Sequence, residues 1–447
     1  MFLKAQIILL FLVITATYVL AQSAKEWNKK GMELYKQGKY GEAAKCFEKA
    51  LDRDPESGDL WFNLGNCYYR MFYYEDASRC YSEALKSKPD SDKFLAYKAC
   101  ALAHLKNFEG AEKYSKKAME ANPQGAYGSL AKGIILVYQD RYEEAVKYLD
   151  KSLTINPKSF DGWFYKGWNL YHLGKYEEAI KCYNKAIEID PKNAYAWNNK
   201  GAALSDIGKY EEAIKCYNKA IEIDPEDVLT WNNKGWALYR LGKYEEAIKC
   251  YNKVIEIDPE YAYAWYKKGV ALHYPGKYEE AIKCYNKAIE IDPENDYAWT
   301  GRGWALYRLG KYEEAIKCID KALEINPEKS SHISFKGLLL SKLGKQGEGL
   351  KYCDRALELD PKDPDVWENK GLVMAEEGKY EEGLTFCDKG LELDPENKSI
   401  MAAKGEILYK QGKYVDSVRW FDKALAISPE YMRAKKGKEE ALKSLEK

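Results

Sequence analysis

The sequence predicts an all-α protein, an α-solenoid built from about twelve repeats of 34 residues, and three observations support this fold class. Twelve of the fourteen prolines recur at an interval of 34 residues, from Pro55 to Pro429. A fixed interval of this size indicates one supersecondary unit repeated along the chain. Between the prolines, apolar residues recur at helical spacing. The composition, dominated by Lys, Glu, Ala, Leu, Ile and Tyr, contains no Val- or Thr-rich stretch typical of β-strands.

The first 21 residues differ from all that follow them. An apolar run extends from Ala5 to Ala21, and Val19 and Ala21 stand at the −3 and −1 positions of a possible cleavage site. This pattern predicts a signal peptide over residues 1–21. The alternative is an uncleaved N-terminal membrane anchor, because about 17 apolar residues can just span a bilayer, and the lysines that follow the run would then keep the repeats cytoplasmic. We expect an exported or membrane-associated protein, extracytoplasmic in preference to cytoplasmic.

Residues 160–193 illustrate how one repeat is expected to fold. In the first half, Trp163 and Gly167 stand four residues apart on one helical face. Gly174 then ends this helix, since glycine readily adopts the left-handed conformation that closes a helix, and nine of the twelve repeats carry it. The second half forms another amphipathic stripe, which Pro191 terminates because proline cannot donate a hydrogen bond within a continuing helix. Each repeat is thus a helix, a tight turn and a second helix.

Twelve such repeats cover residues 24–431, and those within residues 160–329 are the most regular and nearly identical to one another. In this block, Pro275 replaces an apolar residue near the end of a first helix, so we expect that helix to end early. The charged residues 432–447 favour helix and are predicted to form a C-terminal capping helix, since the last repeat of a solenoid needs a polar cover for its apolar face.

One repeat carries the residue pattern of a known family. The pattern consists of Trp197, Gly201, Leu204, Ala213, Tyr217, Ala220 and Pro225. It resembles the tetratricopeptide-repeat (TPR) signature at its 34-residue period. The resemblance implies a right-handed superhelix whose first helices line a concave groove, where ligands meet positions 2, 5, 6, 9, 12 and 13 of each repeat. The sequence departs from the family at the position before the glycine, which is lysine in most repeats, as at Lys200.

Several patterns that suggest chemistry have simpler explanations. Lys plus Arg equals Asp plus Glu at 70 each, so no net field favours nucleic acid as a partner. Gly174-Lys175 lacks the spacing, the following Ser or Thr, and the preceding strand of a phosphate-binding loop. The four histidines stand in separate repeats without metal-ligand spacing. We therefore predict no enzyme, no cofactor and no metal site.

Five cysteines occupy one position of successive second helices, which lie too far apart for a disulfide. These are Cys182, Cys216, Cys250, Cys284 and Cys318. They are predicted to be free thiols that act as small, semi-buried apolar side chains.

The candidate binding residues lie at groove positions of the regular block. Aromatic residues alternate with small ones at positions 9 and 12, and side-chain amides suited to a peptide backbone stand at position 6. The candidates are Trp168, Tyr171, Asn199, Asn233, Trp236, Tyr239, Trp304 and Tyr307. The alternative is that the indoles pack against the helices of neighbouring repeats.

These residues predict a protein-interaction scaffold that binds a peptide or protein partner along the groove, with assembly of a surface or membrane complex as one use. The alternative function is binding of a polysaccharide by an envelope protein, because Trp and Tyr faces can stack on sugar rings. Association with a membrane would involve the N-terminal segment.

Overall fold

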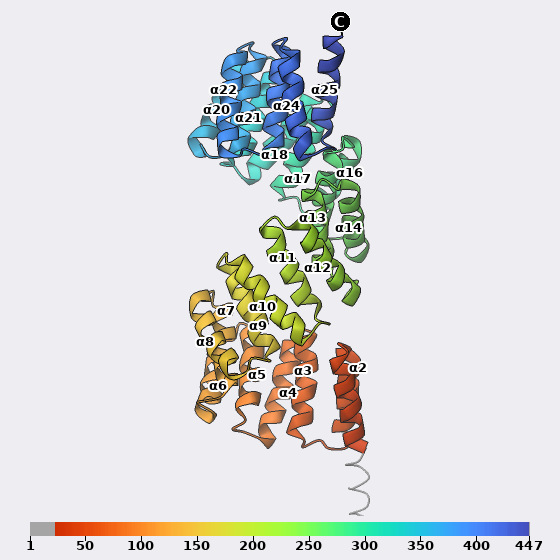
Figure 1. Cartoon of the computed structure of the whole chain (residues 1–447), viewed down its shortest axis with the longest axis vertical. Helices are drawn as coiled ribbons and strands as arrows, with labels where there is room; N and C mark the ends of the chain where they lie inside the picture. The colour runs from red at the N-terminus through yellow and green to blue at the C-terminus, as the bar shows by residue number, and fades with distance from the viewer. Residues whose placement is uncertain (1–22, 447) are drawn as a thin grey trace, which may run out of the picture. The chain divides into compact units, whose positions relative to one another are not determined.

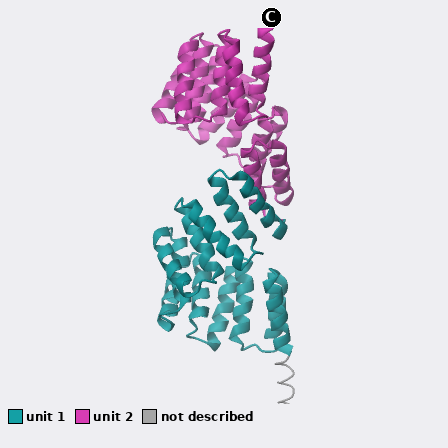
Figure 2. Ribbon diagram, in the orientation of Figure 1, with its two compact units in different colours: residues 1–225 teal, residues 226–447 magenta. Residues whose placement is uncertain are grey.

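The computed structural model describes residues 23–446, and their regular structure is entirely helical (Figure 1). The chain divides after Pro225 into two compact units (Figure 2). We call them the N-terminal unit and the C-terminal unit, and each contains six repeats. The predicted signal peptide or anchor, residues 1–21, lies outside the described residues. No helix within residues 23–446 has both the length and the apolar character needed to span a membrane.

In the N-terminal unit, each repeat contributes a first and a second helix. The first helices are residues 23–36, α3 (Gly58–Arg70), α5 (Asp92–His104), α7 (Ala126–Tyr138), α9 (Phe160–His172) and α11 (Ala194–Asp206). The second helices are α2 (Tyr40–Leu51), α4 (Tyr74–Ser87), α6 (Phe108–Ala121), α8 (Tyr142–Ile155), α10 (Tyr176–Ile189) and α12 (Tyr210–Ile223).

The C-terminal unit follows the same order and adds one helix at the end. Its first helices are α13 (Val228–Arg240), α15 (Ala262–His273), α17 (Asp296–Arg308), α19 (Ser330–Lys342), α21 (Pro364–Glu376) and α23 (Lys398–Lys410). Its second helices are α14 (Tyr244–Ile257), α16 (Tyr278–Ile291), α18 (Tyr312–Ile325), α20 (Gln346–Leu359), α22 (Tyr380–Leu393) and α24 (Tyr414–Ile427). The additional helix, α25 (Met432–Leu445), packs on α24 and α23.

The helix ends follow the predicted register. The break between α12 and α13 spans Pro225, as expected. Helix α15 ends at His273 and has 12 residues, one fewer than α13 and α17, which confirms the early end ahead of Pro275. Proline at this point fixes the backbone and removes a hydrogen-bond donor, so the helix ends one residue earlier.

Left-handed residues close the turn inside each repeat. Gly174 has φ 72°, and eight further glycines at the same position of other repeats also have positive φ. Three repeats adopt the same turn without glycine, at Phe72 (φ 65°), Lys106 (φ 58°) and Asp140 (φ 58°). The turn is therefore imposed by the packing of the two helices, and glycine only makes it less costly.

Close approach of the two helices explains the invariant small residue of the first helix. A Cβ built on Gly167 would lie 2.8 Å from the Tyr183 ring of the second helix, so any side chain there would have to displace that ring. Trp163 fixes the turn that precedes its helix, because its indole Nε1 donates a hydrogen bond to the Pro157 carbonyl at 2.9 Å. The same bond recurs at Trp61, Trp197, Trp265, Trp299 and Trp367.

All eleven cysteines are free and buried.

Candidate partner-binding surface

The repeats of the regular block differ mainly in their first helices, and among the second helices only α18 departs from the common sequence at more than one residue, at Ile319, Asp320 and Leu323. The second helices α10, α12 and α16 have the same sequence, and α14 differs from them at one residue, Val254. The first helices α9, α11, α13, α15 and α17 differ from one another at most positions outside the Trp, Gly and Leu framework. Second helices of one sequence cannot distinguish one segment of a partner from the next. Selective binding by the repeats that share one second-helix sequence therefore depends on their first helices.

In the N-terminal unit, the first-helix side chains fill the space between their own helices. The imidazole of His104 hydrogen-bonds through Nε2 to the hydroxyls of Tyr69 (2.9 Å) and Tyr165 (2.8 Å), and through Nδ1 to that of Tyr138 (2.8 Å). The ring of Tyr74 stacks on it at 3.8 Å. Burial lowers the pKa of His104 to about 3, so the ring is neutral at physiological pH.

A second set of contacts joins repeats that are far apart in this unit. Arg70 of α3 forms an ion pair with Asp161 of α9 at 3.2 Å, and Asp161 also accepts a hydrogen bond from the Tyr97 hydroxyl at 3.0 Å. The ring of Phe72 meets that of Tyr195 at 4.8 Å. The unit thus closes on itself, and side chains of α3, α5, α7 and α9 occupy the face that a groove ligand would need.

The sequence-predicted residues of the N-terminal unit take no part in the His104 and Arg70 contacts just described. Trp168 is 36% exposed, and its ring neighbours are Phe164 and His172 of its own helix. The Tyr171 hydroxyl donates to Asp206 at 2.6 Å, across to the next repeat. Asn199 is half-buried and accepts a hydrogen bond from Asn198.

In the C-terminal unit, the predicted residues fall into two groups. Trp304 stacks on Phe335 of α19 at 3.6 Å, and Tyr307 is buried beside the same ring. Tyr307 is part of the core between repeats, and Trp304 is partly buried and packs against that core. Trp236 is half-buried and stacks on Tyr239 at 5.3 Å. Asn233 is also half-buried.

Trp236 lies beside a cluster that the sequence did not single out. Its ring is 4.4 Å from the Lys267 ammonium, which also lies 4.9 Å from the Tyr263 ring and 5.5 Å from the Tyr266 ring. The ring of Tyr297 on α17 follows at 6.3 Å from Tyr266. We call these five residues the aromatic patch. Tyr263 and Tyr297 are 41% and 51% exposed, so the patch faces solvent.

The charge at the centre of the aromatic patch lacks a carboxylate partner among the residues that the structure describes. Partial burial lowers the pKa of Lys267, and the phenol of Tyr297 acts against this shift. Aromatic faces attract the ammonium through their quadrupole but leave its hydrogen-bond donors unused. The patch can therefore take an anionic group at Lys267 and apolar side chains at Tyr263 and Tyr297. A signal for it was available in the sequence, since Tyr263 and Tyr297 both stand at position 2, one repeat apart.

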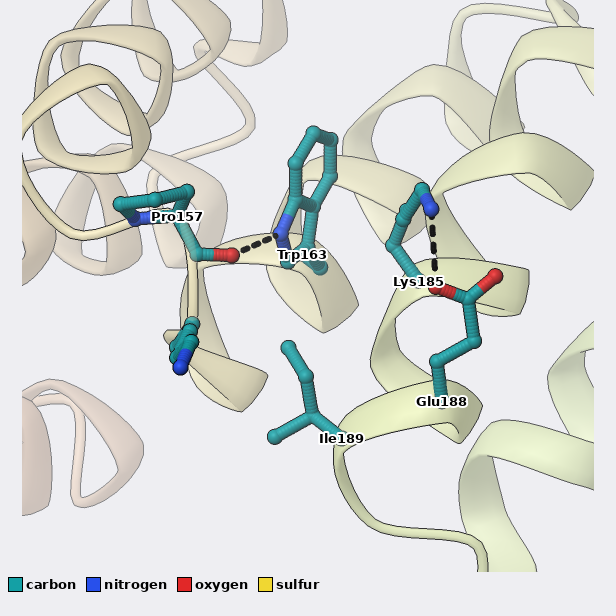
Figure 3. Close-up of a pocket in the computed structure, with 6 residues that line it drawn as sticks. Pro157, Trp163, Lys185, Glu188 and Ile189 are labelled. Carbon is teal, nitrogen blue, oxygen red and sulfur yellow. Dashed lines mark hydrogen bonds and ion pairs between the residues drawn. The ribbon is translucent and has the colours of Figure 1, made fainter.

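A shallow hollow lies at the edge of the fifth repeat (Figure 3). It has a volume of about 560 Å³ and is lined by Pro157, Lys158, Trp163, Lys185, Glu188 and Ile189. Most of its polar groups are already paired, because Trp163 bonds to the Pro157 carbonyl and Lys185 pairs with Glu188 at 2.8 Å. The same residue types recur in the next repeat, so the hollow results from the repeat and offers no distinctive chemistry. Residues 23–446 also contain no cluster of three potential metal ligands.

Comparison with protein families gives matches over most of the chain. Models described as Tetratricopeptide repeat match residues 28–70, 58–91, 95–124, 194–227, 228–261, 250–283, 297–329, 334–363, 352–385 and 388–431. A model described as TPR repeat matches residues 169–208 and 271–310, and one described as Protein prenyltransferase alpha subunit repeat matches residues 142–173. None of the curated protein sequences compared with the chain matches it.

Solved structures give a similarity of fold. A tetratricopeptide repeat protein from Parabacteroides merdae is 17% identical with a TM-score of 0.50, and the match covers 56% of this chain and 98% of that one. Yeast Tom70 is 18% identical with a TM-score of 0.42, over 95% of this chain and 96% of that one. At these identities, the similarity concerns the helical repeat fold alone.

Proposed function

Because the chain belongs to the tetratricopeptide-repeat family, whose repeats form protein-interaction scaffolds, we propose that it binds a protein or peptide partner through the aromatic patch of its C-terminal unit. The observation that carries the proposal is the Lys267 ammonium, which lies among three rings without a carboxylate partner in the described residues. This fold is typically non-enzymatic, and we propose a binding role without catalysis.

The residues of the aromatic patch indicate which kinds of side chain the partner segment carries. A carboxylate from an acidic side chain or a chain end would pair with Lys267, where partial desolvation strengthens the attraction relative to an exposed lysine. Apolar side chains beside that carboxylate would cover Tyr263 and Tyr297. Large aromatic residues are the most frequent sources of binding energy at protein interfaces. We therefore infer a partner segment that is acidic and apolar together.

Substitutions at the two exposed tyrosines test the proposal. The partner is first captured by crosslinking and pulldown from the native membrane or envelope fraction, and its affinity is then measured. Tyr263→Ala and Tyr297→Ala should each weaken binding about tenfold or more, since truncation of an interface anchor often costs about 2 kcal/mol. Tyr73→Ala is the matched control, because Tyr73 is 58% exposed and lies in the N-terminal unit. Equal binding by all three variants would contradict the proposal.

Charge reversal at the centre of the patch gives a second test. Lys267→Glu should abolish binding, while Lys267→Arg should retain most of it, because a cation over the rings is kept. The melting temperature should fall only slightly, since Lys267 makes no ion pair within the described residues and Lys267→Glu removes only its contacts with the three rings. Loss of binding only in step with a lower melting temperature would point to a structural role.

Polysaccharide binding remains the second candidate, and the exposed faces of Tyr263 and Tyr297 on adjacent repeats are the observation that favours it. A glycan array separates the two functions. Sugar binding would require the tyrosine rings but would be insensitive to Lys267→Glu if the glycan is neutral. The protein-partner proposal requires both.

The place of action is also a proposal. The apolar run within residues 1–21 supports an exported or membrane-associated protein that helps to assemble a surface or membrane complex. Mass spectrometry of native material decides between the two forms. A mature chain that begins at Gln22 would indicate export with cleavage, and retention of residues 1–21 in a membrane fraction would indicate an anchored scaffold.

A further inference from the structure

Helix α25 inserts a charged side chain into the first-helix face of the C-terminal unit. Arg433, near its start, is 3% exposed and reaches between α21 and α23. Its Nη1 donates to Glu368 Oε1 at 2.6 Å and to Ser399 Oγ at 3.0 Å. Its Nε and Nη2 donate to the two oxygens of Glu406 at 2.7 and 2.8 Å. A fork of parallel bonds to one carboxylate is the geometry that distinguishes arginine from lysine.

The receiving residues stand where groove ligands would bind. Glu368, Ser399 and Glu406 are at positions 5, 2 and 9 of their repeats. Tyr266, Tyr263 and Trp236 of the aromatic patch stand at the same three positions of earlier repeats. The two sets have opposite character, because one surrounds a cation with rings and the other surrounds it with carboxylates. Arg433 therefore occupies a site formed by groove residues rather than by the ordinary contacts between repeats.

The site is built for a cation. Glu368 is 5% exposed and also accepts a hydrogen bond from Ser399 Oγ at 3.0 Å. Burial raises the pKa of Glu406, but the charge of Arg433 outweighs this and holds that pKa at about 2. Without Arg433, Glu406 would keep only the longer ion pair with Arg308 at 3.8 Å, and Glu368 would lie buried with no cation beside it among the described residues, which is unfavourable. An empty site would thus attract another guanidinium.

Besides Arg433, helix α25 is held by polar contacts at the surface and by a small apolar interface: Lys438 pairs with Asp422 at 2.6 Å, and the hydroxyls of Tyr409 and Ser444 share a hydrogen bond at 3.3 Å. Of the fourteen residues of α25, only Arg433, Ala434 and Ala441 are buried, and the two alanines contribute little apolar surface. Ser428, just before the helix, shares a hydrogen bond with the Tyr244 hydroxyl at 2.8 Å, and Met432 N, at the first residue of the helix, donates to the Tyr274 carbonyl at 3.1 Å. A short terminal helix with so little buried surface belongs to the parts of a protein that open most readily.

We propose that Glu368, Ser399 and Glu406 form a guanidinium-binding site that α25 occupies with Arg433, and that an arginine on a basic segment of a protein partner competes for it. Helix α25 is then an autoinhibitory strap over this site. The site is separate from the aromatic patch, which takes an acidic segment, so the two proposals are tested by different residues.

Variants of the full chain test the binding site. The probe is a short, fluorescently labelled, acetylated and amidated peptide with one central arginine, compared with the same peptide carrying lysine. Arg433→Ala should bind the arginine peptide at least tenfold more tightly than the unaltered protein does, and should favour it over the lysine peptide. Adding Glu368→Gln to Arg433→Ala should remove the gain. Arg355→Ala is the matched control, because Arg355 is exposed and makes none of the ion pairs described here.

A measurement on the unaltered protein tests displacement without any variant. Low-millimolar N-ethylguanidinium should speed amide hydrogen exchange in residues 432–445 severalfold and leave α17 to α20 unchanged, while ethylammonium at the same concentration should not. No gain by Arg433→Ala, equal gain with the lysine peptide, or no selective exchange of α25 would each overturn the proposal. If Arg433→Ala loses helical structure by circular dichroism, the exchange measurement alone decides.

Discussion

The two tryptophans Trp304 and Trp168 occupy the same position of their repeats, yet their truncation should have different consequences. Trp304 stacks on Phe335 of the next repeat at 3.6 Å with the planes 9° apart, and it packs against a buried core cluster. Truncation of a buried aromatic side chain to alanine costs about 3 to 5 kcal/mol. Because Trp304 is only partly buried, we expect Trp304→Ala to cost about 3 kcal/mol.

Truncation of Trp168 would remove fewer stabilising contacts. It is 36% exposed, and its ring neighbours, Phe164 and His172, lie on its own helix at 6.3 and 5.5 Å. Contacts of this kind within one helix contribute only a few tenths of a kcal/mol each. We expect Trp168→Ala to lower the free energy of unfolding by about 1 kcal/mol or less.

Urea unfolding followed by circular dichroism measures the two losses, and hydrogen exchange shows where they occur. In a solenoid, stability is close to a sum of repeat and neighbour terms, so Trp304→Ala should release protection in α17 to α20 first. Trp168→Ala should leave the exchange pattern of its unit unchanged. Equal losses in the two variants, or a neutral Trp304→Ala, would refute the reasoning from the Phe335 stack.

Three further predictions concern backbone strain and pH. Lys106→Gly should raise the free energy of unfolding by about 0.5 to 1 kcal/mol in urea titrations, because Lys106 holds φ 58°, and Gly174→Lys should lower it by a similar or larger amount. The pKa of His104 is about 3 in the folded chain against an ordinary 6.5. The free energy of unfolding should therefore fall as pH decreases from 6.5 towards 3, by at most about 1.4 kcal/mol per pH unit. His104→Gln should remove this pH dependence. The pKa of Glu406 is about 2 against an ordinary 4.5. Its contribution to the free energy of unfolding should therefore be present above pH 4.5 and be lost as pH falls towards 2. Amide exchange in α25 should become faster over this pH range, and Glu406→Gln should not show this change.

Local features of the fold could be predicted from the sequence because they depend on residues within one repeat. The early end of α15 before Pro275 follows from the conformational limits of proline, and Gly174 indicates the place of the left-handed turn because glycine adopts positive φ at the lowest cost. The buried, free state of Cys182 follows from its place on a second helix.

Closure within each unit could not be predicted in this way. Tyr69 and Tyr165 are 96 residues apart, and Tyr244 and Ser428 are 184 apart, yet each pair shares a hydrogen bond. Such contacts depend on the small rotation from one repeat to the next, which accumulates along the array and is not encoded in any single 34-residue pattern.

The candidate site was predicted only in part, for a related reason. Position 9 was identified as important, but whether a tryptophan there is core or surface depends on position 6 of the following repeat. That residue is Phe335 after Trp304 and Asn199 after Trp168. The exposed Tyr263 and Tyr297 were missed because exposure is a property of the assembled helices.

Sequence identity among α10, α12 and α16 creates a hazard while the chain is folding. Each of these helices fits the docking place of either of the others with the same contacts, so a one-repeat slip would bury a native-looking interface. Repeat proteins are known to misassemble between like modules. The first helices differ, for instance at Tyr165 and Asn199, and these differences favour the correct pairing of repeats. Only the correct neighbouring repeat presents side chains that pack against the ring or bond to the amide. The first-helix side chains that could recognise a partner would thus also prevent mispairing between repeats during folding.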